Sequence, residues 1–245
     1  MKYGLSAMLI VQNQRLTHQS KHITEWHQHA TGQLFCIQRG MIIVKTEQAQ
    51  WALTPATVGW FPAHIRHCAW SVGEVEGHSL QLNHDDAPAF AGVWPADPFM
   101  MSLMERITQC SPARQASLLA VMMEEIRIAP SAPLQLTLPQ DRRAKQVAEL
   151  LLSEPQNTAN QTQLACCYGL SVRTLSRLFS EQTGLSFSQW RQQAKVLASM
   201  AHLLRGVSVS ETAERCGYDN VSAFIAAFRL RFGSTPGQFQ ARNRA

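Results

Sequence analysis

The C-terminal part of the chain carries the same short framework twice. Each copy has a small residue, a glycine, a helix-capping residue and two core residues, at Ala165, Gly169, Ser171, Leu175 and Phe179 and again, 48 or 49 residues later, at Ala213, Gly217, Asn220, Phe224 and Phe228. Glycine permits the left-handed backbone of a tight turn, and Ser or Asn caps the helix that follows. Each copy therefore predicts a short helix, a turn and a second helix, and two such units require an all-α fold in this region.

Apolar residues at helical spacing continue from Asp141 to the end of the chain. They predict helices at residues 142–152, 161–168, 172–182, 187–204, 209–215, 221–231 and 236–242. The helix between the two units spans roughly 27 Å at about 1.5 Å per residue. That length suits a rigid bridge between two helices that enter successive major grooves of DNA, about 34 Å apart.

The positive charge of the chain is concentrated in the same region. Residues 142–245 hold 13 Lys and Arg against 6 Asp and Glu, whereas residues 1–141 hold 9 against 11, so the net charge of +5 comes from the C-terminal part. A basic helical domain beside a mildly acidic one is typical of a nucleic-acid-binding domain joined to a second domain. On charge alone, a basic surface in contact only with solvent is the alternative.

Base contacts are expected on the outward face of the second helix of each unit, because that helix enters the major groove. An arginine that binds guanine through two hydrogen bonds contributes about 1–3 kcal/mol of discrimination. In the first unit the candidate DNA contacts are Arg173, Thr174, Ser176 and Arg177.

The second unit lacks long side chains at the positions equivalent to the two arginines, which are Ser222 and Ala226. Its candidates are small side chains and two arginines placed to contact phosphates: Asn220, Val221, Ser222, Arg229 and Arg231. We therefore predict that the first unit reads the bases and that the second mainly positions the protein on the duplex.

Two segments resemble the AraC/XylS family of bacterial transcription regulators. GYDNVSAFIAAFRLRFGSTPGQF at residues 217–239 is similar to the C-terminal signature of that family, and GLSVRTLSRLFSEQTGLSFSQW at residues 169–190 is similar to its first recognition helix and the start of its linker helix. The resemblance covers residues 142–242. It implies a sequence-specific activator or repressor that binds a double-stranded DNA operator, chiefly through the first recognition helix. Ala226 departs from the family, since some members carry a base-contacting arginine there.

Residues 1–90 alternate short apolar runs with turn residues. Breaks are expected at Arg39-Gly40, Pro55 and Gly73. Close and regular spacing of this kind predicts a β-barrel or a β-sandwich. The candidate strands are Leu34–Ile37, Met41–Val44, Trp51–Leu53, Val58–Phe61 and Ser79–Leu82.

From Pro98 the apolar spacing becomes helical. Stripes over Met100–Ile107 and Leu118–Ile126 predict two amphipathic helices, which either brace the β-domain or contact a second copy of the chain. Residues 129–140, APSAPLQLTLPQ, hold three prolines and no charge. Because proline restricts the backbone, this segment predicts a semi-rigid linker.

Histidines are concentrated around the first strands. His27 and His29 are two residues apart and so point to the same side of a strand, and Gln33 and His67 follow. This pattern resembles the two short motifs of cupin barrels, in which two histidines and an acid from the first motif and one histidine from the second bind a divalent metal. The resemblance implies a Zn²⁺, Ni²⁺ or Fe²⁺ site at His27, His29, Gln33 and His67, with Gln33 as a departure at the acid position.

The same histidines allow two other interpretations. With Gln33 they can line a pocket for a small polar or anionic effector without a metal, and Trp26, Trp60 and Trp70, which flank the motifs, are then candidate pocket walls. They can also be histidines whose hydrogen bonds the barrel itself satisfies. His64 shares a loop with His67 and is a substitute for it in either kind of site.

The combined prediction is an α+β protein of two domains that regulates transcription under the control of a small-molecule or metal effector and is not an enzyme. A homodimer is expected, with RNA polymerase as a further partner of an activator. The alternative is a metal-dependent cupin enzyme with an accessory helical domain. No secretory signal and no apolar run of about 18 residues is present, so a cytoplasmic location is expected. The predicted parts are a cupin-like sensor at 1–97, bracing or dimerisation helices at 98–128, the linker at 129–140 and a double helix-turn-helix domain at 141–245.

Overall fold

The computed structural model describes residues 9–19, 22–83 and 88–243. The chain forms two compact units, one of residues 1–46 and 51–135 and the other of residues 47–50 and 136–245. The first unit is built on antiparallel strands and the second on helices. The α+β fold class predicted from the sequence is therefore confirmed.

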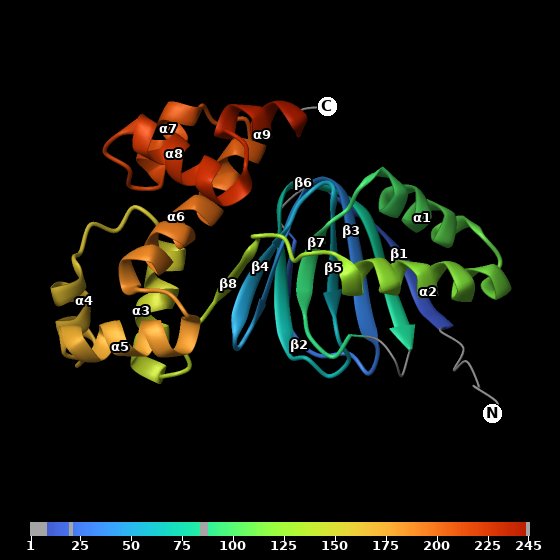
Figure 1. Ribbon diagram of the computed structural model, residues 1–245, viewed down its shortest axis with the longest axis horizontal. Coiled ribbons are helices and arrows are strands. Elements are labelled where there is room, and N and C mark those ends of the chain that lie inside the picture. The colour runs from blue at the N-terminus through green and yellow to red at the C-terminus, as the bar shows by residue number, and fades with distance from the viewer. Residues whose placement is uncertain (1–8, 20–21, 84–87, 244–245) are drawn as a thin grey trace. The chain divides into compact units, whose positions relative to one another are not determined.

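The described strands pair into one curved antiparallel sheet, which Figure 1 shows with two helices on one side. The long strand β6 pairs with β1, β2 and β3, while β5 pairs with β3 and β7. The strands are β1 Leu9–His18, β2 Ile23–His27, β3 Gly32–Thr46, β4 Ala49–Leu53, β5 Thr57–Phe61, β6 His67–Asn83, β7 Gly92–Pro95 and β8 Gln135–Thr137.

All five apolar runs proposed as strands lie in strands, but two of the expected breaks are wrong. β3 continues through Gly40 and β6 through Gly73, and the pairing of these strands shifts register between Arg39 and Met41. Both glycines have positive φ, 76° and 73°. The two strands therefore bend together at a bulge instead of ending there, since glycine adopts this backbone with little strain.

Replacing Gly40 with alanine is expected to destabilise the first unit by about 2–4 kcal/mol. A Cβ atom there would lie 2.0 Å from Glu74 O, so strand β6 would have to move. Gly73→Ala is the matched control, because it has the same strained φ and no atom within 4 Å of the added Cβ. Urea unfolding should show a loss at Gly40 that clearly exceeds the loss at Gly73, and equal losses would contradict this account.

Helices α1 Pro98–Gln109 and α2 Pro112–Ile128 cover one face of the sheet. Their buried residues include the predicted stripes and join one hydrophobic core with strand residues. The strand side chains of that core are Leu34, Cys36, Val58, Trp60, Leu80, Leu82 and Trp94, and the helix side chains are Met100, Leu103, Met104, Ile107, Leu119, Met122, Met123 and Ile126.

The proline-containing segment 129–140 is folded, which differs from the linker expected from its composition. Leu134, Leu136 and Leu138 are buried, and the segment includes β8. Backbone bonds hold it, such as Ala132 N to Val93 O at 2.7 Å. Its alternating leucines bury one face of an extended chain, and this outweighs the breaking effect of the prolines around them.

The second unit contains the seven helices predicted from the sequence, with ends that agree to within one residue. They are α3 Arg142–Ser153, α4 Gln161–Cys167, α5 Val172–Thr183, α6 Phe187–Leu204, α7 Val209–Arg215, α8 Val221–Phe232 and α9 Pro236–Arg242. The turn glycines Gly169 and Gly217 have φ of 66° and 70°, as the repeat requires.

The repeat extends further than the sequence framework indicated. Gly184 after α5 and Gly233 after α8 are left-handed caps, 49 residues apart. Capping boxes at Ser186 and Thr235 then begin α6 and α9 at the same offset. Each copy thus comprises a short helix, a glycine turn, a recognition-type helix, a glycine cap and the start of the next helix.

Candidate nucleic-acid interface and histidine pocket

Helix α5 presents two arginines to solvent near its N-terminal end. The hydroxyl of Ser171 accepts from Thr174 N at 3.1 Å and so starts the helix. Arg173 and Arg177 are one turn apart and exposed, so they lie on one face. Arg177 Nη1 donates to Glu181 Oε2 at 2.7 Å, with both side chains more than half exposed, and such a pair is weak enough to open when a base or phosphate competes.

The two shorter candidates on α5 have structural partners. Thr174 Oγ1 shares a hydrogen bond with Ser171 Oγ at 2.8 Å. Ser176 is half-buried, and its hydroxyl accepts from Gln161 Nε2 at 2.7 Å, which ties α4 to α5. Of the four predicted contacts in this unit, the structure therefore leaves the two arginines most available to DNA.

Helix α8 presents a different surface. Asn220 Oδ1 accepts from Ser222 N at 2.7 Å and caps the helix, so this amide has a structural function. A shallow hollow along the outer face is lined by Ser222, Ile225, Ala226, Arg229 and Leu230. Leu230 is 89% exposed, and the sequence analysis did not select it.

The two arginines of α8 differ in their surroundings. Arg229 is exposed and remains a candidate for phosphate contact. Arg231 is half-buried, its guanidinium lies 6.0 Å from the centre of the Phe232 ring, and burial lowers its pKa to about 10. Its placement favours a packing function over the phosphate contact that we expected.

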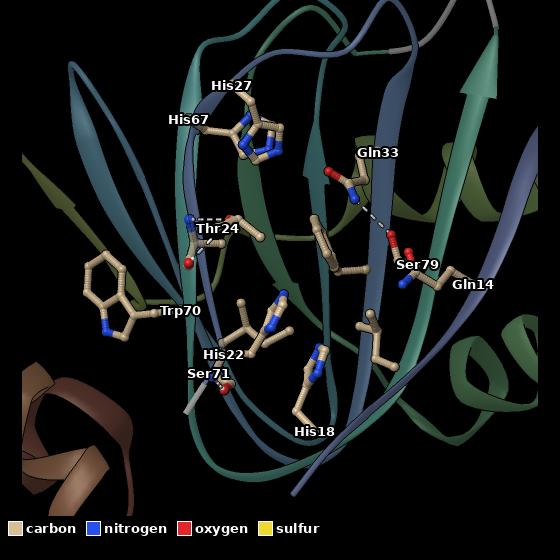
Figure 2. A pocket seen from close by; sticks show the side chains of 14 residues that line it. Gln14, His18, His22, Thr24, His27, Gln33, His67, Trp70, Ser71 and Ser79 are labelled. Atoms are coloured by element: carbon tan, nitrogen blue, oxygen red, sulfur yellow. Dashed lines mark hydrogen bonds between the residues drawn. The ribbon is translucent and has the colours of Figure 1, made fainter. Parts of the chain in front are cut away.

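The first unit contains a polar cavity of about 110 Å³ between β1, β2, β3 and β6. Figure 2 shows its polar side chains converging on the interior. It is lined by Gln14, Leu16, His18, His22, Thr24, His27, Gln33, Phe35, Ile42, His67, Ala69, Trp70, Ser71 and Ser79.

Two of the predicted ligands, His27 and His67, line one end of this cavity, and His29 lies beside them. One ring nitrogen of each lies within 4.8 Å of the others. The Nδ1 atoms of His27 and His67 donate to Glu25 O at 2.6 Å and Ile65 O at 2.9 Å, since a carbonyl only accepts. These bonds orient the rings of His27 and His67 and leave the lone pair of each Nε2 atom free to bind a ligand. This arrangement is usual for metal-binding histidines.

The surroundings of His29 and His67 favour the neutral form of both rings. Burial lowers the pKa of His67, an effect that the neighbouring His27 and His29 strengthen and the bond to Ile65 O opposes. Burial also lowers the pKa of His29, with His27 as the second cause. Among the described residues, His29 Nε2 is buried without a hydrogen-bond partner. Neutral rings and an orphaned buried nitrogen fit a divalent metal as well as a polar ligand.

Gln33 stands beside this cluster. Its Nε2 donates to Ser79 Oγ at 2.9 Å, while its buried Oε1 has no hydrogen-bond partner within the described ranges. Figure 2 shows that oxygen on the side that faces His27 and His67. An amide oxygen held in this way is a suitable fourth donor, so the departure from an acid at this position is compatible with a metal site.

The other end of the cavity holds a second histidine pair that the sequence analysis missed. The rings of His18 and His22 are stacked, with centroids 4.4 Å apart and planes 5° from parallel. Ser71 fixes the backbone of His22 through two bonds: its Oγ accepts from His22 N at 2.7 Å, and its N donates to His22 O at 2.9 Å. His22 is exposed, and no local signal indicated that β1 would bring His18 beside it.

Of the three tryptophans proposed as pocket walls, Trp70 lines the cavity and the other two lie elsewhere. Trp26 is 40% exposed beneath Arg66, and Trp60 is 1% exposed in the hydrophobic core. Successive side chains of a strand point to opposite faces, so Phe61, and not Trp60, stacks on His67 at 6.2 Å between centroids. His64 lies outside the three-histidine group.

Comparison with known proteins identifies a helix-turn-helix domain in the second unit. The family described as "Helix-turn-helix domain" matches residues 164–242. The HTH-type transcriptional regulator NimR of Escherichia coli is 28% identical over 223 residues, which cover 88% of this chain and 82% of that protein. RipA of Corynebacterium glutamicum is 37% identical over 102 residues, covering 42% and 31%. The solved structure of ToxT from Vibrio cholerae aligns with 98% of this chain and all of that one, at 10% identity and a TM-score of 0.44.

A basic helical unit with two helix-turn-helix motifs, matched by relatives of this kind, defines a DNA-binding transcriptional regulator. Residues 164–242 form a helix-turn-helix domain, and the relatives NimR and RipA are HTH-type transcriptional regulators, which agrees with the resemblance to the AraC/XylS family. In the part of the chain that the structure describes, no helix has both the length and the apolar character needed to cross a bilayer.

Proposed function

We propose that this regulator reads its operator chiefly with α5 and responds to an effector bound in the histidine pocket. The observation that supports the readout is the contrast between the recognition helices. α5 exposes Arg173 and Arg177 on one face, while the equivalent face of α8 carries Ser222 and Ala226. Arginine reads guanine through two donors, whereas small side chains make only weak apolar contacts with bases.

For the effector, the supporting observation is the group formed by His27, His29 and His67 beside the oxygen of Gln33. These residues would hold a divalent metal, which when bound supplies a positive charge and an open coordination position for a polar ligand. Since His27 ends β2, His29 follows it in the next loop and His67 begins β6, occupancy of the site would fix these two strands against each other. A small effector that hydrogen-bonds to the same nitrogens without metal would act similarly.

Two further parts of the proposal concern assembly. Exposed apolar side chains on α1 and α2, namely Phe99, Val121 and Ile128, support a contact between two copies of the chain. As an activator, the bound dimer would also contact RNA polymerase. NimR and RipA are both described as transcriptional regulators. They therefore support a regulatory function for this chain, in preference to that of a metal-dependent cupin enzyme.

Selection from a random double-stranded DNA pool tests the proposal. The full-length chain would be equilibrated with the pool at one fixed salt concentration, once with Zn²⁺ and once with a chelator. We expect a site with several strongly specified bases under one unit and weak specification one helical turn away. Equal specification in both halves would exclude dominant reading by α5, and identical results with zinc and with chelator would exclude zinc as the effector.

A further inference from the structure

The segment that leads into the first helix-turn-helix unit lies against the turn of the second. Residues 154–160 join α3 to α4, and Figure 1 shows this segment running beside α6 towards α8. A Cβ atom placed on Gly217 would lie 3.0 Å from Gln156 Cα and 3.3 Å from Pro155 O. The entry to the first unit and the turn of the second are therefore in direct backbone contact.

Arg191, in the first half of α6, binds this entry segment. Its Nη1 donates to Ala159 O at 2.6 Å, and its Nη2 donates to Asn157 O. Asn157 Oδ1 accepts from Ala159 N at 2.9 Å, so the segment is also bonded internally. One guanidinium thus holds two carbonyls immediately before Asn160, the residue that caps α4.

Lys195 lies one turn further along the same face of α6 and binds the turn of the second unit. Its Nζ donates to Gly217 O at 2.6 Å and lies 5.4 Å from the centre of the Tyr218 ring. This contact fixes the chain just before Asn220, the cap of α8. Arg191 and Lys195 together hold the starts of both motifs to one face of the connecting helix.

Both cations are half-buried, and this burial has an energetic cost. Burial lowers the pKa of Arg191, and it lowers the pKa of Lys195, which the nearby charge of Arg191 lowers further. Desolvated like charges one turn apart are favourable only while hydrogen bonds compensate them. The carbonyls of Asn157, Ala159 and Gly217 provide those bonds as long as both motifs keep their present positions on α6.

We propose that Arg191 and Lys195 are positioning residues that fix the spacing at which the two recognition helices meet DNA. The inference rests on the proposed use of both units in one binding event. Arg143 provides a comparison, because its Nη1 donates to Gly169 O at 3.0 Å and so holds the turn of the first unit in the same way. That bond joins α3 to the first motif alone, so it stabilises one unit without tying it to the other.

The test uses the full-length chain and the selected operator, together with an operator that carries one extra base pair between the two halves. The insertion moves the halves apart by about 3.4 Å along the duplex axis. We expect the affinity of the wild-type chain to fall about tenfold or more on insertion, because two motifs held at a fixed spacing cannot both contact half-sites that have moved apart. The double variant Arg191→Met, Lys195→Met should lose less than about threefold, because its motifs can adjust independently.

Two controls make the result decisive. Arg143→Met removes an equivalent bond to a turn carbonyl and should keep the full wild-type penalty for insertion. Lys195→Arg retains a donor at this place and, made alone, should also keep that penalty. A double variant that binds the first half-site normally but shows the wild-type insertion penalty would overturn the spacing function of these residues. A wild-type chain that selects no DNA from the pool would overturn the proposed function itself.

Discussion

Arg177→Ala is expected to lower the affinity for the selected operator by about 5- to 150-fold, which corresponds to roughly 1–3 kcal/mol for a two-donor contact with guanine. The side chain is exposed on α5 and has only an exposed partner, Glu181, so its loss costs the free protein little. Specificity should relax at one or two adjacent base pairs and remain elsewhere. Competition binding against operators with single substitutions measures both effects.

The matched variant is Ser222→Ala on α8. Ser222 is exposed at the position equivalent to Arg173, and its substitution should change affinity less than about threefold. Arg229→Ala serves as a phosphate-contact control, which should weaken binding to all sequences alike and reduce its salt dependence. If Ser222→Ala relaxed specificity while Arg177→Ala did not, the assignment of readout to α5 would be wrong.

Removing one histidine from the pocket cluster is expected to abolish tight zinc binding. His27→Ala deletes one of three converging nitrogens, and a loss of at least about 100-fold is expected, since even changes to the partners of ligating residues cost 10- to 100-fold. Isothermal titration of the purified chain with Zn²⁺ measures this. His64→Ala is the control, because His64 is close in sequence to His67 but outside the cluster, and it should bind zinc normally.

The same titration has a predictable pH dependence. Metal competes with protons for the imidazole nitrogens, and burial lowers the pKa of His29 and His67 below the ordinary 6.5. Protons are therefore weaker competitors here than at an ordinary histidine, so zinc binding should persist below pH 6.5 and decline only as these lowered pKa values are crossed. If the wild-type chain did not bind zinc at pH 7, the zinc site would be excluded. The pocket for a small polar or anionic effector without a metal, which the sequence also allowed, would then be favoured.

The sequence predicted the helical unit closely because its signals are local. Capping residues such as Ser171 and left-handed glycines such as Gly184 mark helix ends within a few residues of the bonds they make. It predicted the β-unit less well because strand pairing is long-range. β1 is largely polar and pairs with β6, and the partner of His18 is Val75, far along the chain, so nothing near His18 indicated that it would line a cavity.

Errors at the pocket have a similar origin. Trp60 was assigned to the site because it precedes a histidine motif, but the alternation of side chains along β5 directs it into the core and leaves Phe61 beside His67. His27, His29 and His67 are neighbours as predicted, but not through a shared strand face: β2 ends at His27, His29 follows in the next loop, and His27 is paired with His67 on β6. What the sequence did not specify is the depth of the cavity and the second pair of histidines at its far end.

Because α5 and α8 differ, the protein can bind a site on DNA in only one of the two orientations along the duplex. On the proposed readout, a site on DNA is defined mostly by the few bases that meet Arg173 and Arg177, and the apolar face around Ala226 and Leu230 tolerates many sequences a helical turn away. New sites can then arise in a promoter by a small number of base changes, and their two orientations are distinct. Evolution could enlarge or rearrange the set of controlled genes through such sites without altering the protein.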